Sequence, residues 1–260
     1  MKGVIPYLGM APVRKAAMHT FAPDDIAAID RELADKGYII LRPEGLEALC
    51  LRAREEYVTA FRATRSQPPK KRFSFADLKN GPWKKMVIGS QNGVGESYAQ
   101  LLQAVYFDAF VSPCPALADL FRFMNTLRNQ LMKVAPDFGD EPTRDKFWNA
   151  CRVHHYPRGG GFMMMHRDTH FPLKLGDLPF YQIMVPLSVK GRDFLHGGGV
   201  LVTKQGEKLN TDEVGGFGSV VIFDGRIQHA VEDVDPQEIM DFQDERGRLA
   251  AFSNLYVVQT

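Results

Sequence analysis

The chain has 260 residues, of which 45% are hydrophobic and 24% are charged, a composition typical of a globular protein with a large core. Its formal net charge is +1 at pH 7, so no overall positive field favours nucleic acid or anionic lipid. No segment approaches the roughly 18 apolar residues of a membrane helix, and the N-terminus lacks a signal-peptide core. The three cysteines form no CxxC motif. We therefore expect a cytoplasmic protein that binds neither membrane nor nucleic acid, with its oligomeric state left open.

The first half of the chain has mainly helical patterns. Residues 23–37 begin with a proline and two acids and stop at a glycine, which is typical of a capped helix. Residues 65–95 are rich in Pro, Lys, Gly, Ser and Asn and predict loops. Helices are predicted at 23–37, 46–64, 96–110 and 116–135, and a short strand at 38–42.

From about residue 146 the pattern changes to short apolar or alternating runs separated by Gly, Pro, Asp and Lys. These runs are 148–157, 180–189, 198–204, 218–224, 228–234 and 248–258. Six short strands in succession predict an antiparallel sandwich or barrel, with the earlier helices covering one sheet face. We expect one α+β domain over residues 1–260, in which 1–145 form the covering part and 146–260 the barrel core.

The stretch HHYPRGGGFMMMHRDTHF, residues 154–171, contains four histidines. On a helix, His166 and His170 would share a face and suggest zinc; on a strand, His166 and Asp168 would share one instead. Three glycines directly before the run FMMMHRD are poor helix formers, so we favour the strand. No HExxH motif is present, which makes a zinc hydrolase a remote alternative.

A third ligand comes from much further along the chain. His229 follows the buried-looking run 218–224, far enough from Asp168 for several strands to run out and back. Two histidines and one carboxylate form the facial triad of non-haem Fe(II) proteins and leave three coordination positions open. We therefore predict that His166, Asp168 and His229 bind the metal and form the catalytic centre.

Four blocks in this order resemble the signature of the Fe(II)/2-oxoglutarate-dependent oxygenases, in their phytanoyl-hydroxylase-like and prolyl-hydroxylase-like branches. The blocks are His166-Arg167-Asp168, GGGV with Gly198 and Gly199, GSVVIFDGRIQHAVEDV and GRLAAFS. The resemblance covers about residues 150–260 and implies a double-stranded β-helix, a cupin-like jelly-roll barrel. It further implies Fe(II), 2-oxoglutarate and O2, used to hydroxylate an unactivated C–H of a small molecule with succinate and CO2 as coproducts. Desaturation and cyclisation stay open, whereas an acid at Asp168 argues against halogenation.

The resemblance also implies residues that hold the cosubstrate. Arg248, at the start of the last strand, would pair with the distal carboxylate of 2-oxoglutarate, with Arg246 as the alternative. The interval from His229 to Arg248 is longer than in the family because residues 235–246 look like an insertion. Tyr156 and Gln182 are further candidates for contacts with the cosubstrate.

Candidate substrate contacts come from two places. Arg152 and His154 would share a strand face with Tyr156, whereas His155 would face away and be structural. The predicted loops at 65–95 offer Trp83 and Gln91, and the segment 235–246 offers further contacts. Neighbouring Lys84 and Lys85 suggest a substrate with a carboxylate, such as an amino acid; a secondary metabolite is the other small-molecule class expected.

Two other functions stay open from the sequence. One is a cupin-type metalloenzyme that does not use 2-oxoglutarate; such proteins offer more histidines and a Glu and lack an equivalent of Arg248. The other is a non-enzymatic β-barrel binding protein in which the three predicted ligands come together by accident. Metal content and 2-oxoglutarate turnover separate these functions.

Overall fold

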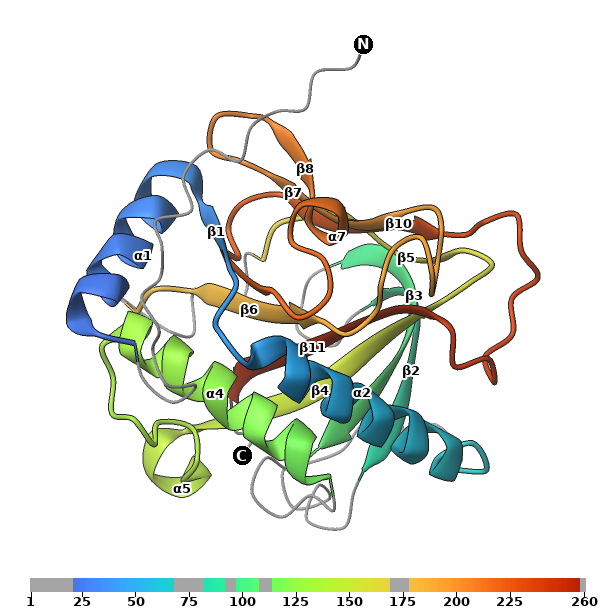
Figure 1. Cartoon of the computed structure of the whole chain (residues 1–260), viewed down its shortest axis with the longest axis horizontal. Helices are drawn as coiled ribbons and strands as arrows, with labels where there is room; N and C mark the ends of the chain where they lie inside the picture. Colours follow the sequence, from blue (N-terminus) through green and yellow to red (C-terminus); the bar gives the residue numbers. More distant parts are fainter. Residues whose placement is uncertain (1–20, 68–81, 92–96, 108–113, 169–177, 258–260) are drawn as a thin grey trace.

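The computed structural model describes residues 21–67, 82–91, 97–107, 114–168 and 178–257. Eleven strands form one curled antiparallel sheet, and helices cover one of its faces (Figure 1). The strands are β1 (Tyr38–Leu41), β2 (Trp83–Gln91), β3 (Ser97–Phe107), β4 (Phe147–Pro157), β5 (Gly161–His166), β6 (Tyr181–Pro186), β7 (Gly198–Val202), β8 (Lys208–Asn210), β9 (Val220–Asp224), β10 (His229–Val234) and β11 (Gly247–Val257). The helices are α1 (Pro23–Lys36), α2 (Leu46–Ala63), α4 (Pro115–Met132) and the short α5 (Pro142–Asp145) and α7 (Thr211–Val214).

The strand order shows how the sheet closes into a barrel. Along the sheet the strands run β1-β9-β6-β11-β4-β3-β5-β10-β7-β8, and β2 pairs with the other edge of β3. Phe223 on β9 contacts the ring of His229 on β10, although the two strands are far apart in this order. The two ends of the sheet therefore face each other, which is the arrangement of a double-stranded β-helix.

The outer face of the sheet packs on helices. Figure 1 shows α2 and α4 side by side across β4, β6 and β11. The large core cluster joins Tyr57 and Phe61 of α2 and Phe121 of α4 to outward-facing strand residues such as Val153 and Ala251. α1 begins with Pro23 and ends at Gly37, whose φ of 82° suits glycine, as the sequence predicted. No helix in the described ranges is long and apolar enough to cross a membrane.

Two predictions for the first half of the chain were wrong. The helix expected at 96–110 is strand β3 over Ser97–Phe107, and the expected loops at 65–95 contain strand β2. β3 is buried on both faces, with Leu102 facing the inside of the barrel and Val105 packing under the helices. A strand covered on both sides lacks the alternation of apolar and polar residues, and the four-residue spacing of Leu101 and Val105 and of Leu102 and Tyr106 imitates a helix. The prediction of one domain over residues 1–260 stays a prediction.

Candidate metal centre and its cavity

The three predicted ligands meet at one end of the β5–β10 pair. His166 is the last residue of β5 and His229 the first of β10, and the two are partners across the antiparallel ladder. Asp168 follows β5 and is held by its backbone N–H, which donates to the carbonyl of Gly225 at 2.9 Å. The Nε2 atoms of His166 and His229 lie 3.7 and 3.6 Å from the carboxylate oxygens of Asp168. All three ligand atoms lie within 4.8 Å of one another, which is close enough to share one metal ion.

Both histidines are oriented by their own backbone. Nδ1 of His166 lies 2.8 Å from the carbonyl oxygen of Met164, and Nδ1 of His229 lies 3.0 Å from that of Ile227. A carbonyl accepts only, so each Nδ1 is assigned the proton and donates it. Each Nε2 then presents a lone pair toward Asp168, which is the tautomer that a metal-binding histidine requires.

The donor set fits a divalent transition metal. Two neutral imidazole nitrogens and one carboxylate oxygen on one side of an ion are the set used by non-haem Fe(II) enzymes. The side chains are nearly buried, at 7% exposure for His166, 9% for Asp168 and 12% for His229. The ring of Tyr98 stacks on His166 with centroids 3.7 Å apart and closes the site from the β3 side.

Gly225 leaves the space that the carboxylate of Asp168 needs. A Cβ at Gly225 would lie 2.3 Å from the ring of Phe180 and 3.1 Å from Oδ2 of Asp168. Any side chain there would displace Phe180 or the ligand carboxylate. Gly225 therefore belongs to the centre through its lack of a side chain, although nothing in the sequence motif indicated it.

The centre opens into a cavity of about 140 Å³ inside the barrel. Most of the predicted site residues line it: Arg152, His154, Tyr156, His166, Asp168, Gln182, His229 and Arg248. Trp83 instead packs against the apolar cluster of Tyr106 and Trp148, while Lys85, two residues further along β2, lines the cavity. The side chain of Gln91 lies outside the described residues.

Arg248 is fully buried in the cavity wall. Its Nε donates to Oδ2 of Asp212 at 2.7 Å, and its guanidinium carbon lies 5.5 Å from the ring centre of Tyr156. Nη1 has no hydrogen-bond partner among the described residues. A Cβ at Gly199 would come within 2.5 Å of Nη2, so only glycine on β7 leaves room for this guanidinium. Arg246, the alternative, is 61% exposed and pairs with Asp244 outside the barrel.

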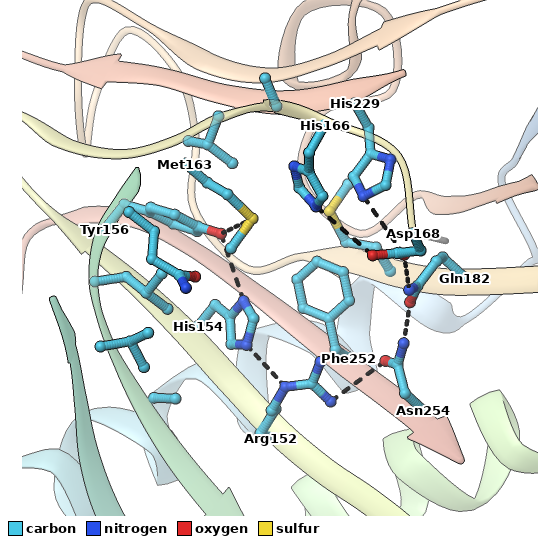
Figure 2. A pocket seen from close by; sticks show the side chains of 18 of the residues that line it. Arg152, His154, Tyr156, Met163, His166, Asp168, Gln182, His229, Phe252 and Asn254 are labelled. Atoms are coloured by element: carbon cyan, nitrogen blue, oxygen red, sulfur yellow. Dashed lines mark hydrogen bonds and ion pairs between the residues drawn. The ribbon is translucent and has the colours of Figure 1, made fainter. Parts of the chain in front are cut away.

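A chain of hydrogen bonds runs from the metal centre along the cavity wall (Figure 2). Gln182 donates to Oδ2 of Asp168 at 2.7 Å and accepts from Asn254. Asn254 in turn accepts from Nη1 of Arg152 at 3.3 Å. Figure 2 shows these side chains in one row along the barrel interior, so the position of the ligand carboxylate depends on residues of β6, β11 and β4.

The same chain continues to Tyr156. Nε of Arg152 donates to Nε2 of His154 at 2.7 Å, and Nδ1 of His154 lies 3.4 Å from the hydroxyl of Tyr156. Burial, together with Arg152, Arg248 and Lys85, holds the pKa of His154 well below its usual range, so the ring is neutral. Burial raises the pKa of Tyr156 to about 12, which keeps its hydroxyl protonated.

The remaining histidines and the segment 235–246 lie away from the cavity. His155 points outward under α2, where its ring meets those of Phe61 and Tyr57, as expected for a structural residue. His170 lies outside the described residues. Within the segment 235–246, Glu245 pairs with Arg62 of α2, and no residue of the segment is among those lining the cavity. The segment also packs at Asp235 against Arg158 and the backbone of His196, and its expected substrate contacts stay a prediction.

Besides Gly225, the sequence analysis did not identify Asp212 and Asn254 as residues of the site. Asp212 lies in the short helix α7 and carries no motif that links it to Arg248. Asn254 lies six residues beyond Arg248 on β11, so the period of two along a strand places both on the same face. That periodicity was a usable signal for Asn254.

Comparisons with known proteins agree with this fold. No protein-family model and no curated protein matches the sequence. Among solved structures, a prolyl-4-hydroxylase from Pseudomonas putida matches at 17% identity with a TM-score of 0.51, over 88% of this chain and 97% of that one. The non-heme alpha-ketoglutarate-dependent epimerase SnoN from nogalamycin biosynthesis matches at 11% identity with a TM-score of 0.52, over 91% and 84%. The chain thus has the double-stranded β-helix fold of the 2-oxoglutarate oxygenases, which confirms the predicted fold class.

Proposed function

We propose that this protein is an Fe(II)- and 2-oxoglutarate-dependent oxygenase that hydroxylates an unactivated C–H of a small molecule. The observation that carries the proposal is the meeting of His166, Asp168 and His229 in a cavity that also holds Arg248. Two structural neighbours are a prolyl-4-hydroxylase and an alpha-ketoglutarate-dependent epimerase, and their likeness to this chain supports the choice of cofactors. We further propose that the reaction is hydroxylation rather than desaturation or cyclisation. A location in the cytoplasm is also part of the proposal.

In this proposal His166, Asp168 and His229 hold Fe(II), and Arg248 holds the distal carboxylate of 2-oxoglutarate. When bound, the two supply the oxidising power for O2-dependent attack on a C–H bond, with succinate and CO2 as coproducts. Arg248 suits this role because Nη1 is buried without a partner among the described residues and a carboxylate would satisfy it. Asp212 fixes the other side of the same guanidinium.

The remaining residues position these groups. Gln182 fixes one oxygen of Asp168 by its hydrogen bond, and Tyr98 and Phe223 limit access of water to the two histidines. Tyr156 packs under the Arg248 guanidinium and is a candidate contact for the cosubstrate. The protein therefore orients ligands and excludes water, and the bound group supplies the reactive chemistry.

The test is succinate formation from 2-oxoglutarate with Fe(II), ascorbate and O2, without added substrate. We expect slow turnover by the wild type, loss of iron binding in His166→Ala, and retained iron binding with much weaker 2-oxoglutarate binding in Arg248→Ala. A wild-type protein that binds no iron would refute the proposal and favour a non-enzymatic barrel. Oxygen uptake that needs iron but not 2-oxoglutarate would instead favour a cupin-type metalloenzyme.

A further inference from the structure

Arg152 is a buried cation on the cavity wall that lacks an acidic partner. The residue is 6% exposed and lies near the middle of β4, facing the inside of the barrel. An arginine has five N–H donors and keeps its charge at every physiological pH. Three of them are used: Nε donates to His154, and Nη1 donates to the Ala150 carbonyl at 3.0 Å and to Asn254. Nη2 has no acceptor among the described residues.

The neighbours of Arg152 do not neutralise it. Asp168 is the single acid among the described cavity-lining side chains, and the proposed metal ion uses it. Arg248 has its own counterion in Asp212, and Lys85 adds a further cation to the same wall. A buried cation that has neither a counterion nor acceptors for all of its N–H groups is costly, so this part of the cavity favours an anion that arrives with a ligand.

The apolar surroundings of Arg152 restrict what that anion can be attached to. Its guanidinium carbon lies 5.3 Å from the ring centre of Tyr256, 5.5 Å from Phe252 and 5.9 Å from Tyr106. One nitrogen with two free N–H groups, together with one lysine, supplies enough donors for a single carboxylate. A phosphate dianion would leave more of its charge unmatched. The aromatic walls favour an apolar body next to the carboxylate.

This subsite is separate from the one proposed for the cosubstrate. Arg152 is the ladder partner of Phe252, and Arg248 is the partner of Tyr156, so the two arginines lie four residues apart along β4 and β11. At about 3.3 Å per residue, their backbones are roughly 13 Å apart. Arg152 is also joined to Asp168 through Asn254 and Gln182, which places it on a wall that reaches the metal centre.

We propose that Arg152, with Lys85, binds the carboxylate of a small substrate that carries an apolar or aromatic body. The inference rests on the proposed oxygenase function, because only that function makes the bound carboxylate a substrate. The anion subsite itself is a property of this chain and is testable without turnover.

The experiment measures binding to the metal-free wild-type protein by calorimetry. The probes are 3-phenylpropionate, its neutral amide 3-phenylpropanamide, and 2-phenylethylphosphonate. Because hydrogen bonds to a charged group contribute about 1.5–3 kcal/mol, we expect the carboxylate to bind about tenfold or more tightly than the amide. Equal binding of the carboxylate and the amide, or tighter binding of the phosphonate, would overturn the proposal.

Variants locate the subsite. Arg152→Met should bring the carboxylate and amide affinities within about twofold, Arg152→Lys should restore part of the difference, and Lys85→Met should reduce it about threefold. Arg122→Met, which removes an exposed arginine from α4, is the matched control and should retain the wild-type difference. If Arg152→Met does not fold, Lys85→Met still decides, because an unchanged difference in that variant contradicts a two-cation subsite.

A competition experiment separates this inference from the proposed function. In the Mn(II)-loaded protein without O2, 3-phenylpropionate and 2-oxoglutarate should bind together without competing. Competition, with a loss of 2-oxoglutarate affinity in Arg152→Met, would assign Arg152 to the cosubstrate and overturn the inference. Failure of the protein to bind Mn(II) or Fe(II) at all would refute the proposed function instead and leave the apoprotein result standing.

Discussion

The two faces of the β4–β11 pair differ in how completely they satisfy the hydrogen-bond donors of a buried arginine. On the outer face, Arg128 of α4 is buried and all three of its nitrogens donate to neutral oxygens. The acceptors are Asn125, Asn129, Phe138, Asn149 and Ser253. On the inner face, Arg152 leaves Nη2 without an acceptor among the described residues, and Arg248 leaves Nη1 in the same state.

This difference in hydrogen bonding distinguishes a structural arginine from two arginines that face the cavity of the same sheet. Burial lowers the pKa of Arg128 to about 10, so it remains a cation at neutral pH, and the protein satisfies it completely. The N–H groups left open on Arg152 and Arg248 face the cavity and are available to a ligand, whereas those of Arg128 are not. Four experiments test this contrast between the faces.

The largest effect is expected at Arg128. Arg128→Met leaves several buried oxygens without a donor and should lower the free energy of unfolding by about 3–5 kcal/mol. Arg152→Met borders a cavity that water can enter and should cost about 1 kcal/mol or less. Chemical denaturation of the two variants measures both values. Equal losses would mean that Arg152 is a structural residue like Arg128.

The second effect concerns His155, on the outer face of β4. Burial lowers the pKa of His155 to about 4, whereas an unfolded histidine titrates near 6.5. The unfolded chain therefore binds the proton first, so this stability is complete above about pH 6.5. It is lost as the pH falls toward 4, by about 3 kcal/mol in all.

His155→Phe should remove this part of the acid sensitivity, since Phe61 and Tyr57 provide an aromatic environment for the new ring. The measurement is urea denaturation at a series of pH values between 4 and 7. A wild-type slope retained in the variant would show that the acid sensitivity arises elsewhere.

A third effect concerns the space left beside Arg248. Gly199→Ala would place a methyl group 2.5 Å from Nη2 of Arg248 and from Oγ1 of Thr211. Displacing the guanidinium should weaken 2-oxoglutarate binding about tenfold or more while leaving Fe(II) affinity unchanged. The control is Gly206→Ala, where nothing lies within 4 Å and only the positive φ of 87° adds strain. Unchanged 2-oxoglutarate affinity in Gly199→Ala would remove Arg248 from the cosubstrate site.

The smallest effect concerns the support of the metal ligands. Gln182→Ala removes the hydrogen bond to Asp168 and should weaken Fe(II) binding about tenfold, as for other partners of metal ligands. Gln103→Ala is the control on the outer face, where the side chain donates to the Phe242 carbonyl. Metal titration of both variants compares the faces directly. Equal loss in both would show a general effect of destabilisation.

The sequence predicted the barrel strands from residue 146 onward better than it predicted the elements in the first half of the chain. The run 218–224 and its neighbours alternate or are continuously apolar between turn residues, so their strands follow from the pattern. β3 was predicted as a helix because Leu101, Leu102, Val105 and Tyr106 stand at the i, i+1, i+4 and i+5 spacing of a helix face. Tertiary burial on both faces decided its conformation, and a single sequence carries no signal of that burial.

Within the site, the residues on a strand were easier to predict than their partners across the barrel. Arg152, His154 and Tyr156 follow from the period of two along β4, and the structure places all three on the cavity wall. The contact of Asp212 with Arg248 depends on how α7 folds back over β7, which local pattern does not determine.

The pairing of β5 with β10 gives the metal centre an unusual independence from the rest of the barrel mouth. His166 and His229 are ladder partners, so their separation follows from the backbone hydrogen bonds of two paired strands. Loops such as 235–246 can therefore change in length or sequence without moving these two ligands. The third ligand behaves differently, because Asp168 is joined to Arg152 through Gln182 and Asn254. A change in the wall around Arg152 would therefore reach the metal centre through this carboxylate, while the spacing of the two histidines stays fixed by the ladder.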